Sequence, residues 1–204
     1  RDPTSRLLQR IAAYGPILRD RQAVGYMACT ALGFVGVVPL ITNSSFVFQS
    51  FYGLTPFQYG LCFSLIMLGG SLGAYLNSRV VARLGIGKLI GIGTASMAVG
   101  GTAALVLTLA GGGVVGILVR GVLYMFGVGF TFANPMARTM SRFPSSMGAA
   151  SAVFGVNQFL VGAVVAAGLS LMSTPSPLPL ALTTALAGCT CAAVWWGWLH
   201  KLSA

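Results

Sequence analysis

The side chains that could move protons lie near the two ends of the chain. Asp2 and Asp20 are the only acids and both precede the first long apolar segment, while the one histidine, His200, follows the last. Proton relays across a membrane normally use Asp, Glu or His at membrane depth. We therefore expect that any proton-coupling site of the complete protein lies outside this chain.

The remaining reactive side chains do not form an enzyme site. The four cysteines all lie inside apolar runs, and Cys189 and Cys191 are about 200° apart around a helix, so they cannot share a face. The expectation is four small buried hydrophobic side chains, Cys29, Cys62, Cys189 and Cys191, rather than a disulfide framework or a zinc site. With no nucleophile–base set among the apolar runs, we predict no catalytic residue, no metal and no cofactor.

Arg120 is the one charged side chain deep in an apolar run. It lies about six residues, roughly 9 Å by helix rise, from the start of its segment. It could extend to the outer lipid headgroups, or it could face a water-filled cavity and pair with a carboxylate or an anionic substrate. A carboxylate partner would have to come from outside this chain, because no acid lies in any of the apolar runs.

The elements that must position these residues are helices in lipid. Of 204 residues, 56% are hydrophobic and 7% are charged, against about 25% charged in a typical soluble domain. Six apolar segments are each long enough to cross a bilayer, and no strand pattern is present. Their spans are 22–45, 57–76, 88–110, 115–137, 148–172 and 179–199. The sequence predicts an all-α membrane protein with a six-helix bundle over 22–204.

The segment 1–21 is less apolar and carries five arginines. Two interpretations stay open for it: an amphipathic segment lying on the inner leaflet, or a solvated cytoplasmic linker. Small residues within the six runs predict close helix packing. They include Gly69, Gly73, Gly127, Gly155 and Gly162.

Charge predicts the orientation of the bundle. Eleven of the twelve basic residues precede the first segment, follow the last, or fall between the second and third or the fourth and fifth. Because cytoplasmic loops are enriched in Lys and Arg, both termini are expected in the cytoplasm. The net charge of +10 is spread among apolar runs, which argues against nucleic acid as a partner and for a lipid bilayer.

Several residue strings resemble Bcr/CflA-type drug transporters of the major facilitator superfamily. The strings are Ser44–Gln49, Tyr52–Phe57 and Tyr59–Leu61; then Gly73, Asn77, Arg79, Arg83 and Gly85; then Phe132–Arg138, Phe143–Pro144 and Gly148–Gly155 with Gln158. Their ordered succession covers residues 17 to 172. The resemblance implies that the six helices are helices seven to twelve of a twelve-helix transporter, the C-terminal half of the fold, with a 3+3 inverted repeat.

The resemblance further implies a secondary active transporter in a bacterial inner membrane. It would export drug-like molecules such as bicyclomycin, sulfonamides or chloramphenicol against inward proton flow, by alternating access. One departure concerns gating: Asn77 stands where the superfamily's corresponding loop carries an acid, so no acid-based gating contact is expected there. The fifth-helix antiporter motif lies outside this chain, so the direction of exchange cannot be checked in it.

Two groups of residues are candidates for function under this interpretation. One wall of the substrate cavity would consist of Phe34, Arg120, Tyr124, Phe130, Asn157 and Gln158. A mostly apolar wall with few polar anchors suits amphipathic, drug-sized molecules. The cytoplasmic loops and their gating contacts would use Asn77, Arg79, Arg83, Arg138 and Arg142. Asn157 and Gln158 could instead bridge helices by hydrogen bonds, and the four arginines could be topology determinants alone.

Two other interpretations of the whole chain stay open. The first is a non-transporting membrane scaffold or receptor half, in which the amides and Tyr124 would make close helix–helix contacts. The second is an autonomous six-helix transporter that works as a homodimer.

Overall fold

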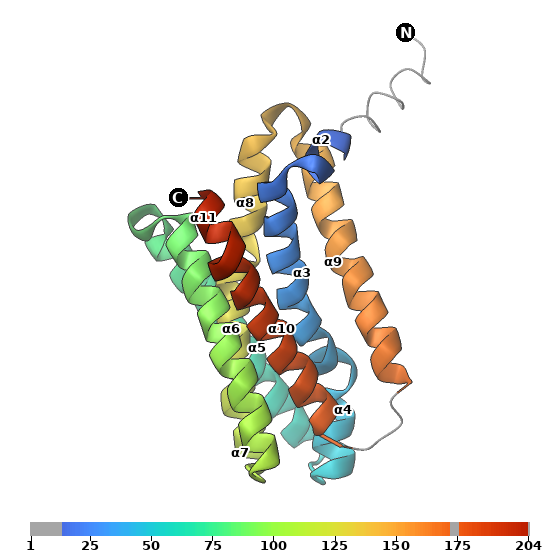
Figure 1. The fold of residues 1–204 in the computed structure, drawn as a ribbon. Helices are drawn as coiled ribbons and strands as arrows, with labels where there is room; N and C mark the ends of the chain where they lie inside the picture. The colour runs from blue at the N-terminus through green and yellow to red at the C-terminus, as the bar shows by residue number, and fades with distance from the viewer. Residues whose placement is uncertain (1–13, 172–175, 204) are drawn as a thin grey trace.

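The computed structural model describes residues 14–171 and 176–203. Within these ranges the chain is helical without a strand, and the long helices run side by side as an elongated bundle (Figure 1). The long helices are α3 (Arg21–Thr42), α5 (Pro56–Leu84), α6 (Ile86–Leu109), α7 (Gly113–Thr131), α9 (Met147–Ser170) and α10 (Leu178–Val194). The short ones are α2 (Tyr14–Arg19), α4 (Ser44–Phe46), η1 (Val47–Phe51), α8 (Ala133–Arg142), η2 (Pro144–Ser146), η3 (Trp195–Leu199) and α11 (His200–Ser203).

Six helical stretches are long and apolar enough to cross a membrane, which confirms the predicted all-α class and helix count. Three of these stretches combine consecutive elements: α7 continues into α8, η2 leads into α9, and α10 continues through η3 into α11. Of the predicted segment 1–21, residues 1–13 lie outside the described residues, and α2 with the start of α3 covers the rest.

The prediction that the basic residues lie in loops is wrong for the arginines named above. Arg79 and Arg83 are in the last turns of α5, which ends only at Leu84, and Arg138 and Arg142 are in α8. The connection between α5 and α6 is a single residue, Gly85, with φ +77°. A left-handed glycine can reverse the chain this tightly, so the helices extend beyond their apolar cores.

The junction between α7 and α8 is caused by Pro135. Proline has no N–H, so the carbonyl of Thr131, four residues earlier, loses its helical donor. The hydroxyl of Thr30 on α3 donates to that carbonyl at 3.3 Å. A neighbouring helix therefore satisfies the backbone group that proline leaves open, as polar groups in lipid require.

Glycine brings α5, α6, α7 and α10 into close contact, and we call these four helices the glycine-packed block. A Cβ at Gly188 of α10 would lie 2.3 Å from the Met97 carbonyl oxygen of α6. A Cβ at Gly73 of α5 would lie 2.2 Å from the Phe126 carbonyl oxygen of α7. Backbones approach this closely only where the side chain is a hydrogen atom, which is how helices pack in lipid.

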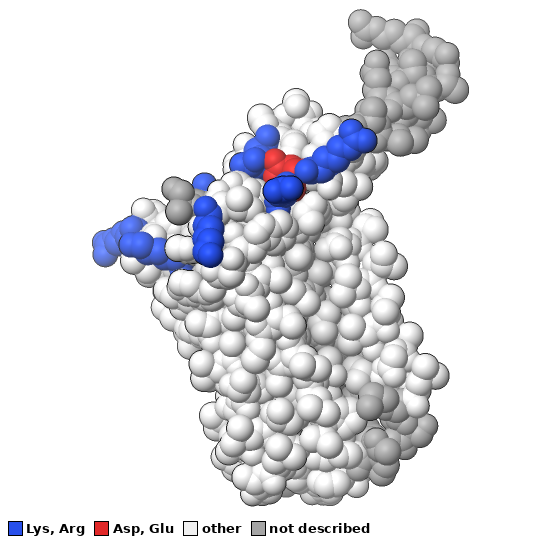
Figure 2. All heavy atoms as spheres, viewed as in Figure 1, with Lys and Arg blue, Asp and Glu red and all other residues white. Residues whose placement is uncertain are grey.

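Apart from Arg120, which is buried within a span, the described basic side chains gather at one end of the bundle. Figure 2 shows them there, beside the red atoms of an acidic side chain, with uncharged surface covering the rest of this face. We call this the basic end; Lys88, Arg138, Arg142 and Asp20 belong to it. The basic residues that the charge pattern predicts on one side of the membrane therefore lie at one end of the structure.

Candidate functional site

Three phenylalanines from separate parts of the chain form a cluster that we call the aromatic face. The Phe34 ring of α3 lies 5.6 Å from the Phe159 ring of α9 and 6.5 Å from the Phe132 ring at the α7–α8 junction, both edge to face. Phe159 is 66% exposed and Phe132 is 42% exposed. Two of the three rings therefore present a large apolar area that this chain does not cover.

Gly162 makes room for the aromatic face. A Cβ at this position of α9 would lie 2.7 Å from Cε1 of Phe34 and 3.4 Å from a methyl group of Val38. The Phe34 ring can therefore lie against α9 only because residue 162 has no side chain. Gly155, two turns earlier on the same helix, has open space where its Cβ would be.

The two predicted amides lie on α9, the helix that also carries Phe159. Asn157 is half-buried, and its Nδ2 donates to the Met27 carbonyl of α3 at 3.2 Å. In this conformation Asn157 therefore bridges two helices, one of the two interpretations left open by the sequence. Gln158 is buried. Contacts of Asn157 and Phe34 thus join α3 and α9 into one surface that is apolar and includes one polar amide.

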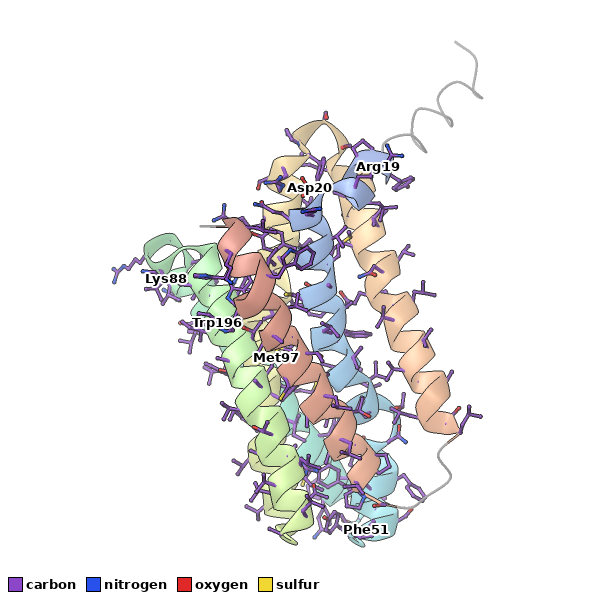
Figure 3. All side chains as sticks on the ribbon, viewed as in Figure 1. Arg19, Asp20, Phe51, Lys88, Met97 and Trp196 are labelled. Carbon is purple, nitrogen blue, oxygen red and sulfur yellow. The ribbon has the colours of Figure 1, made fainter. Side chains whose placement is uncertain are left out.

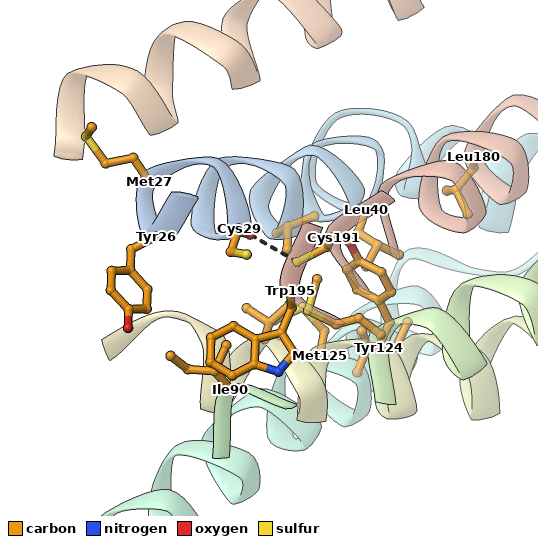
Figure 4. Close-up of a cluster of buried hydrophobic side chains, with 14 of the residues drawn as sticks. Tyr26, Met27, Cys29, Leu40, Ile90, Tyr124, Met125, Leu180, Cys191 and Trp195 are labelled. Atoms are coloured by element: carbon orange, nitrogen blue, oxygen red, sulfur yellow. Dashed lines mark hydrogen bonds between the residues drawn. The ribbon is translucent and has the colours of Figure 1, made fainter. Parts of the chain in front are cut away.

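Three other predicted cavity residues lie apart from this face, inside the bundle. Tyr124 is fully buried and donates its hydroxyl to the Gly33 carbonyl of α3 at 3.1 Å. It belongs to the buried cluster shown in Figure 4, with Cys191 and Trp195 of the last span. Phe130 is also buried, with its ring 5.2 Å from the Phe126 ring.

Arg120 turns toward α6 and is 3% exposed. Its Nη1 donates to the Ala104 carbonyl at 2.5 Å and to the Thr108 hydroxyl. Its Nη2 is buried without a hydrogen-bond partner among the described residues. This placement differs from both sequence-based interpretations. The guanidinium binds a carbonyl and a hydroxyl of the neighbouring helix α6, and it neither extends to the lipid headgroups nor faces a cavity.

The cysteines divide according to their position around the helices. Cys29 and Cys191 are buried, and the Cys191 thiol donates to the Cys29 carbonyl at 3.2 Å. Cys62 is partly buried, and Cys189 is exposed. The expectation of four buried thiols is therefore wrong for Cys189, because it lies on the opposite side of α10 from Cys191.

Asn77 forms a reciprocal amide contact near the start of α8. The Nδ2 of Asn134 donates to Oδ1 of Asn77 at 2.6 Å, and Nδ2 of Asn77 lies 3.4 Å from Oδ1 of Asn134. Asn134 also donates to the Phe130 carbonyl at 2.9 Å. Both amides are buried. The sequence did not pair them, because 57 residues separate them and only the packing of α5 on α8 brings them together.

Arg142 joins α8 to the start of α3. It donates to the Asp20 carboxylate at 2.7 Å and to the Gln22 side chain at 2.6 Å. Asp20 also caps α3 by accepting from the Ala23 amide at 2.8 Å. Burial alone raises the pKa of the Asp20 carboxyl, but the Arg142 hydrogen bond and the Ala23 amide outweigh it and leave the pKa below its usual 3.8.

The other basic residues are exposed. Arg79 lies over the Tyr75 ring, with its Cζ 5.1 Å from the centroid, and Arg83 and Arg138 extend from the ends of α5 and α8. Within the described ranges no three His, Cys, Asp or Glu side chains converge as metal ligands would.

Comparison with known proteins identifies the class. No family model matches the chain. It is 25% identical over 166 residues to a bicyclomycin resistance protein homolog of Haemophilus influenzae, covering 81% of this chain and 42% of that protein. It is 23% identical over 157 residues to YdgK, an uncharacterized MFS-type transporter of Bacillus subtilis, covering 76% of this chain and 39% of that protein.

The chain is thus similar to a resistance protein homolog and to a transporter of the major facilitator superfamily type. Within that superfamily they support the Bcr/CflA type, as the residue strings indicated. The chain spans about two fifths of the length of the curated relatives it matches.

Proposed function

We propose that this chain forms one six-helix half of a secondary transporter that exports amphipathic, drug-like molecules in exchange for protons. The observation that carries the proposal is the aromatic face of Phe34, Phe132 and Phe159, together with the amide of Asn157 that joins the same two helices, α9 and α3. The resistance named for the Haemophilus influenzae relative adds support.

The aromatic face suits such substrates for physical reasons. Its rings offer apolar area with a negative face, which attracts cationic and aromatic molecules. A single nearby amide fixes orientation without demanding one pattern of hydrogen bonds, so related molecules can share the surface. Asn157 would exchange its bond to the Met27 carbonyl for a bond to the substrate.

A second half would cover the helices that this chain leaves open. In the glycine-packed block α5 is the least buried span, and α9 is similarly uncovered on the other flank. Their exposed apolar side chains include Leu65, Leu68, Leu72, Val156, Leu160 and Val164. Two such halves could rock about the central surface and open it to either side of the membrane, as alternating access requires.

Proton coupling would reside in the other half. None of the six spans of this chain contains an acid or a histidine at membrane depth, and a proton relay needs such groups. In this arrangement both termini of the chain face the cytoplasm of a bacterial inner membrane, because the basic end would be on that side.

The experiment measures transport by the protein expressed with whatever sequence flanks this chain in its gene. Gly162→Ala should displace the Phe34 ring and change the relative resistance to bicyclomycin, sulfonamides and chloramphenicol. Phe34→Ala should lower resistance to the substrate that depends most on the ring. Gly155→Ala is the matched control on α9, since its Cβ enters open space.

Unchanged resistance to all three drugs in Gly162→Ala and Phe34→Ala cells, at equal amounts of protein in the membrane, would contradict the proposed substrate wall. The same cells test coupling: an uncoupler that collapses the proton gradient should abolish export. Export that persists without the gradient would contradict proton exchange while leaving the wall intact.

A further inference from the structure

A groove at the basic end is separate from the aromatic face. It has a volume of about 670 Å³ and lies between the start of α6, the middle of α8 and the η3 turn of the last span. Lys88, Arg138, Trp195, Trp196 and His200 are among its lining residues. No acidic side chain lines it, so the groove is electropositive.

The start of α6 supplies backbone donors to the groove. Gly85 precedes the helix and makes no side-chain cap, and residues 85 to 88 line the groove. The first amides of an α-helix have no acceptor within the helix. In a helix of 24 residues, these amides and the positive end of the dipole favour a bound anion.

Trp195 provides an independent sign of a missing acceptor. The residue is 0% exposed, and its Nε1 has no hydrogen-bond partner among the described residues. A Cβ at Gly91, another lining residue, would lie 3.1 Å from this nitrogen. Figure 4 shows Trp195 within the buried cluster, with Ile90 and Met125 near its ring. A buried N–H of this kind normally has a partner, and an acceptor in the groove would provide one.

Two cations complete the polar part of the site. Lys88 and Arg138 are both exposed, and they approach the groove from different helices, α6 and α8. Figure 3 shows Lys88 and Trp196 near one another at this end of the bundle. Two cations, uncapped helix amides and an indole N–H converge without an opposing carboxylate, which is the chemistry of a phosphate site.

The wall of the groove formed by Trp196 and Ile92 is apolar and faces outward. The Trp196 ring is 53% exposed and stacks on the His200 ring with centroids 5.5 Å apart. Ile92, also exposed, continues this wall along α6 into the uncharged surface of the bundle. Tryptophan at such a position is typical of the membrane–water interface. A ligand that fits both walls has an anionic head and apolar chains.

We propose that this groove binds the phosphate headgroup of an anionic phospholipid, with the acyl chains along Ile92 and Trp196. Basic grooves between transmembrane helices at an interface hold such headgroups. A free phosphate would satisfy the polar part but leave the apolar wall unused. The site ties α6, α8 and the last span together from outside the substrate surface.

The experiment uses the protein, with its flanking sequence, in nanodiscs of phosphatidylcholine that contain brominated phosphatidylglycerol or, as the reference, brominated phosphatidylcholine. Bromine quenches tryptophan fluorescence on contact, and all three tryptophans lie at residues 195 to 198. The expected result is stronger quenching by phosphatidylglycerol. Lys88→Gln and Arg138→Gln should each lower the relative association constant about fivefold.

Trp195→Phe keeps an aromatic ring, although a smaller one, and removes the N–H; it should weaken the preference while Trp196 and Trp198 still report. Arg83→Gln is the matched control, because Arg83 is a basic residue of the same end that does not line the groove. Equal quenching by the two lipids, or a preference that Lys88→Gln and Arg83→Gln reduce equally, would overturn the proposal. Loss of the preference on adding inorganic phosphate would overturn the lipid assignment and indicate a free-anion site.

Discussion

The glycine-packed block and the α3–α9 side of the bundle are built by different means. In the block, Gly188 and Gly73 place backbone against backbone, and Asn77 of the block pairs with Asn134 of α8, which continues α7. On the α3–α9 side, Gly155 faces open space, and the rings of Phe34 and Phe159 fill the contact. Both sides are apolar and glycine-rich in sequence, so the difference arises from what each glycine meets.

The difference separates support from binding. Backbone contacts between helices leave little room for these helices to move relative to one another, so we expect the block to behave as a rigid body. Side-chain contacts that end in exposed rings can be exchanged for contacts with another molecule at little cost in helix packing. A transporter half needs both kinds of surface, because a rocking motion moves a rigid unit around a binding surface.

The largest expected effect comes from adding one methyl group to a glycine, once in the glycine-packed block and once on the α3–α9 side. Gly188→Ala should lower the free energy of unfolding by about 1–3 kcal/mol, since its Cβ meets a backbone carbonyl that cannot turn away. Gly155→Ala should be neutral or stabilising by up to about 1 kcal/mol. Thermal unfolding of the purified protein in detergent measures both, and equal effects would remove the distinction between the two sides.

A smaller effect is expected from removing one amide on each side. Asn134→Ala leaves Asn77 buried without its partner and should cost about 1 kcal/mol, whereas Asn157→Ala should cost about 0.6 kcal/mol. A double-mutant cycle sharpens the comparison: Asn77 and Asn134 should couple by at least about 0.5 kcal/mol, and Asn134 and Asn157 should add independently. Additive effects for Asn77 and Asn134 would show that the pair is not a unit.

The smallest effect concerns the ion pair that joins the start of α3 to α8. Asp20→Asn keeps an N-cap and removes the charge opposite Arg142, so it should cost up to about 1 kcal/mol at neutral pH. The folded-state pKa of Asp20 is below 3.8. The stabilisation is therefore present above that pH and is lost as the pH falls through the lower, folded-state pKa.

Unfolding of wild type and Asp20→Asn at neutral pH and at a pH well below 3.8 checks this sign. The two proteins should differ at neutral pH and converge in acid, and added salt should also reduce the difference. A difference that persists in acid would mean that the charge of Asp20 is not what joins the two helices.

How much the sequence could predict depended on the kind of interaction. Hydropathy located the six spans to within a few residues at most ends, because lipid selects apolar helices from composition alone. The errors were at the basic ends of α5 and α8, where Arg79 and Arg142 continue a helix beyond its apolar core. Long basic side chains reach water from a helix end, so hydropathy gives no sign of them.

The candidate site was less accessible to sequence reasoning. Phe34 and Asn157 were identified by their residue type and their position within an apolar run. Tyr124 and Phe130 meet the same criteria, but they lie inside the bundle. Phe159 gave no signal, because an aromatic residue in an apolar run is ordinary. The facing side of each helix could have been inferred only from its neighbours.

The order of apolar and basic residues along the sequence determined that this chain is helical, crosses a bilayer and carries most of its basic residues toward one side. It could do so because solvation in lipid and water acts on each residue separately. Only the tertiary structure decided which glycines lie at helix contacts and that Arg120 binds α6. It also decided that three phenylalanines cluster and that a groove forms at Trp195. These depend on distances between residues far apart in the chain, and a sequence contains no distances.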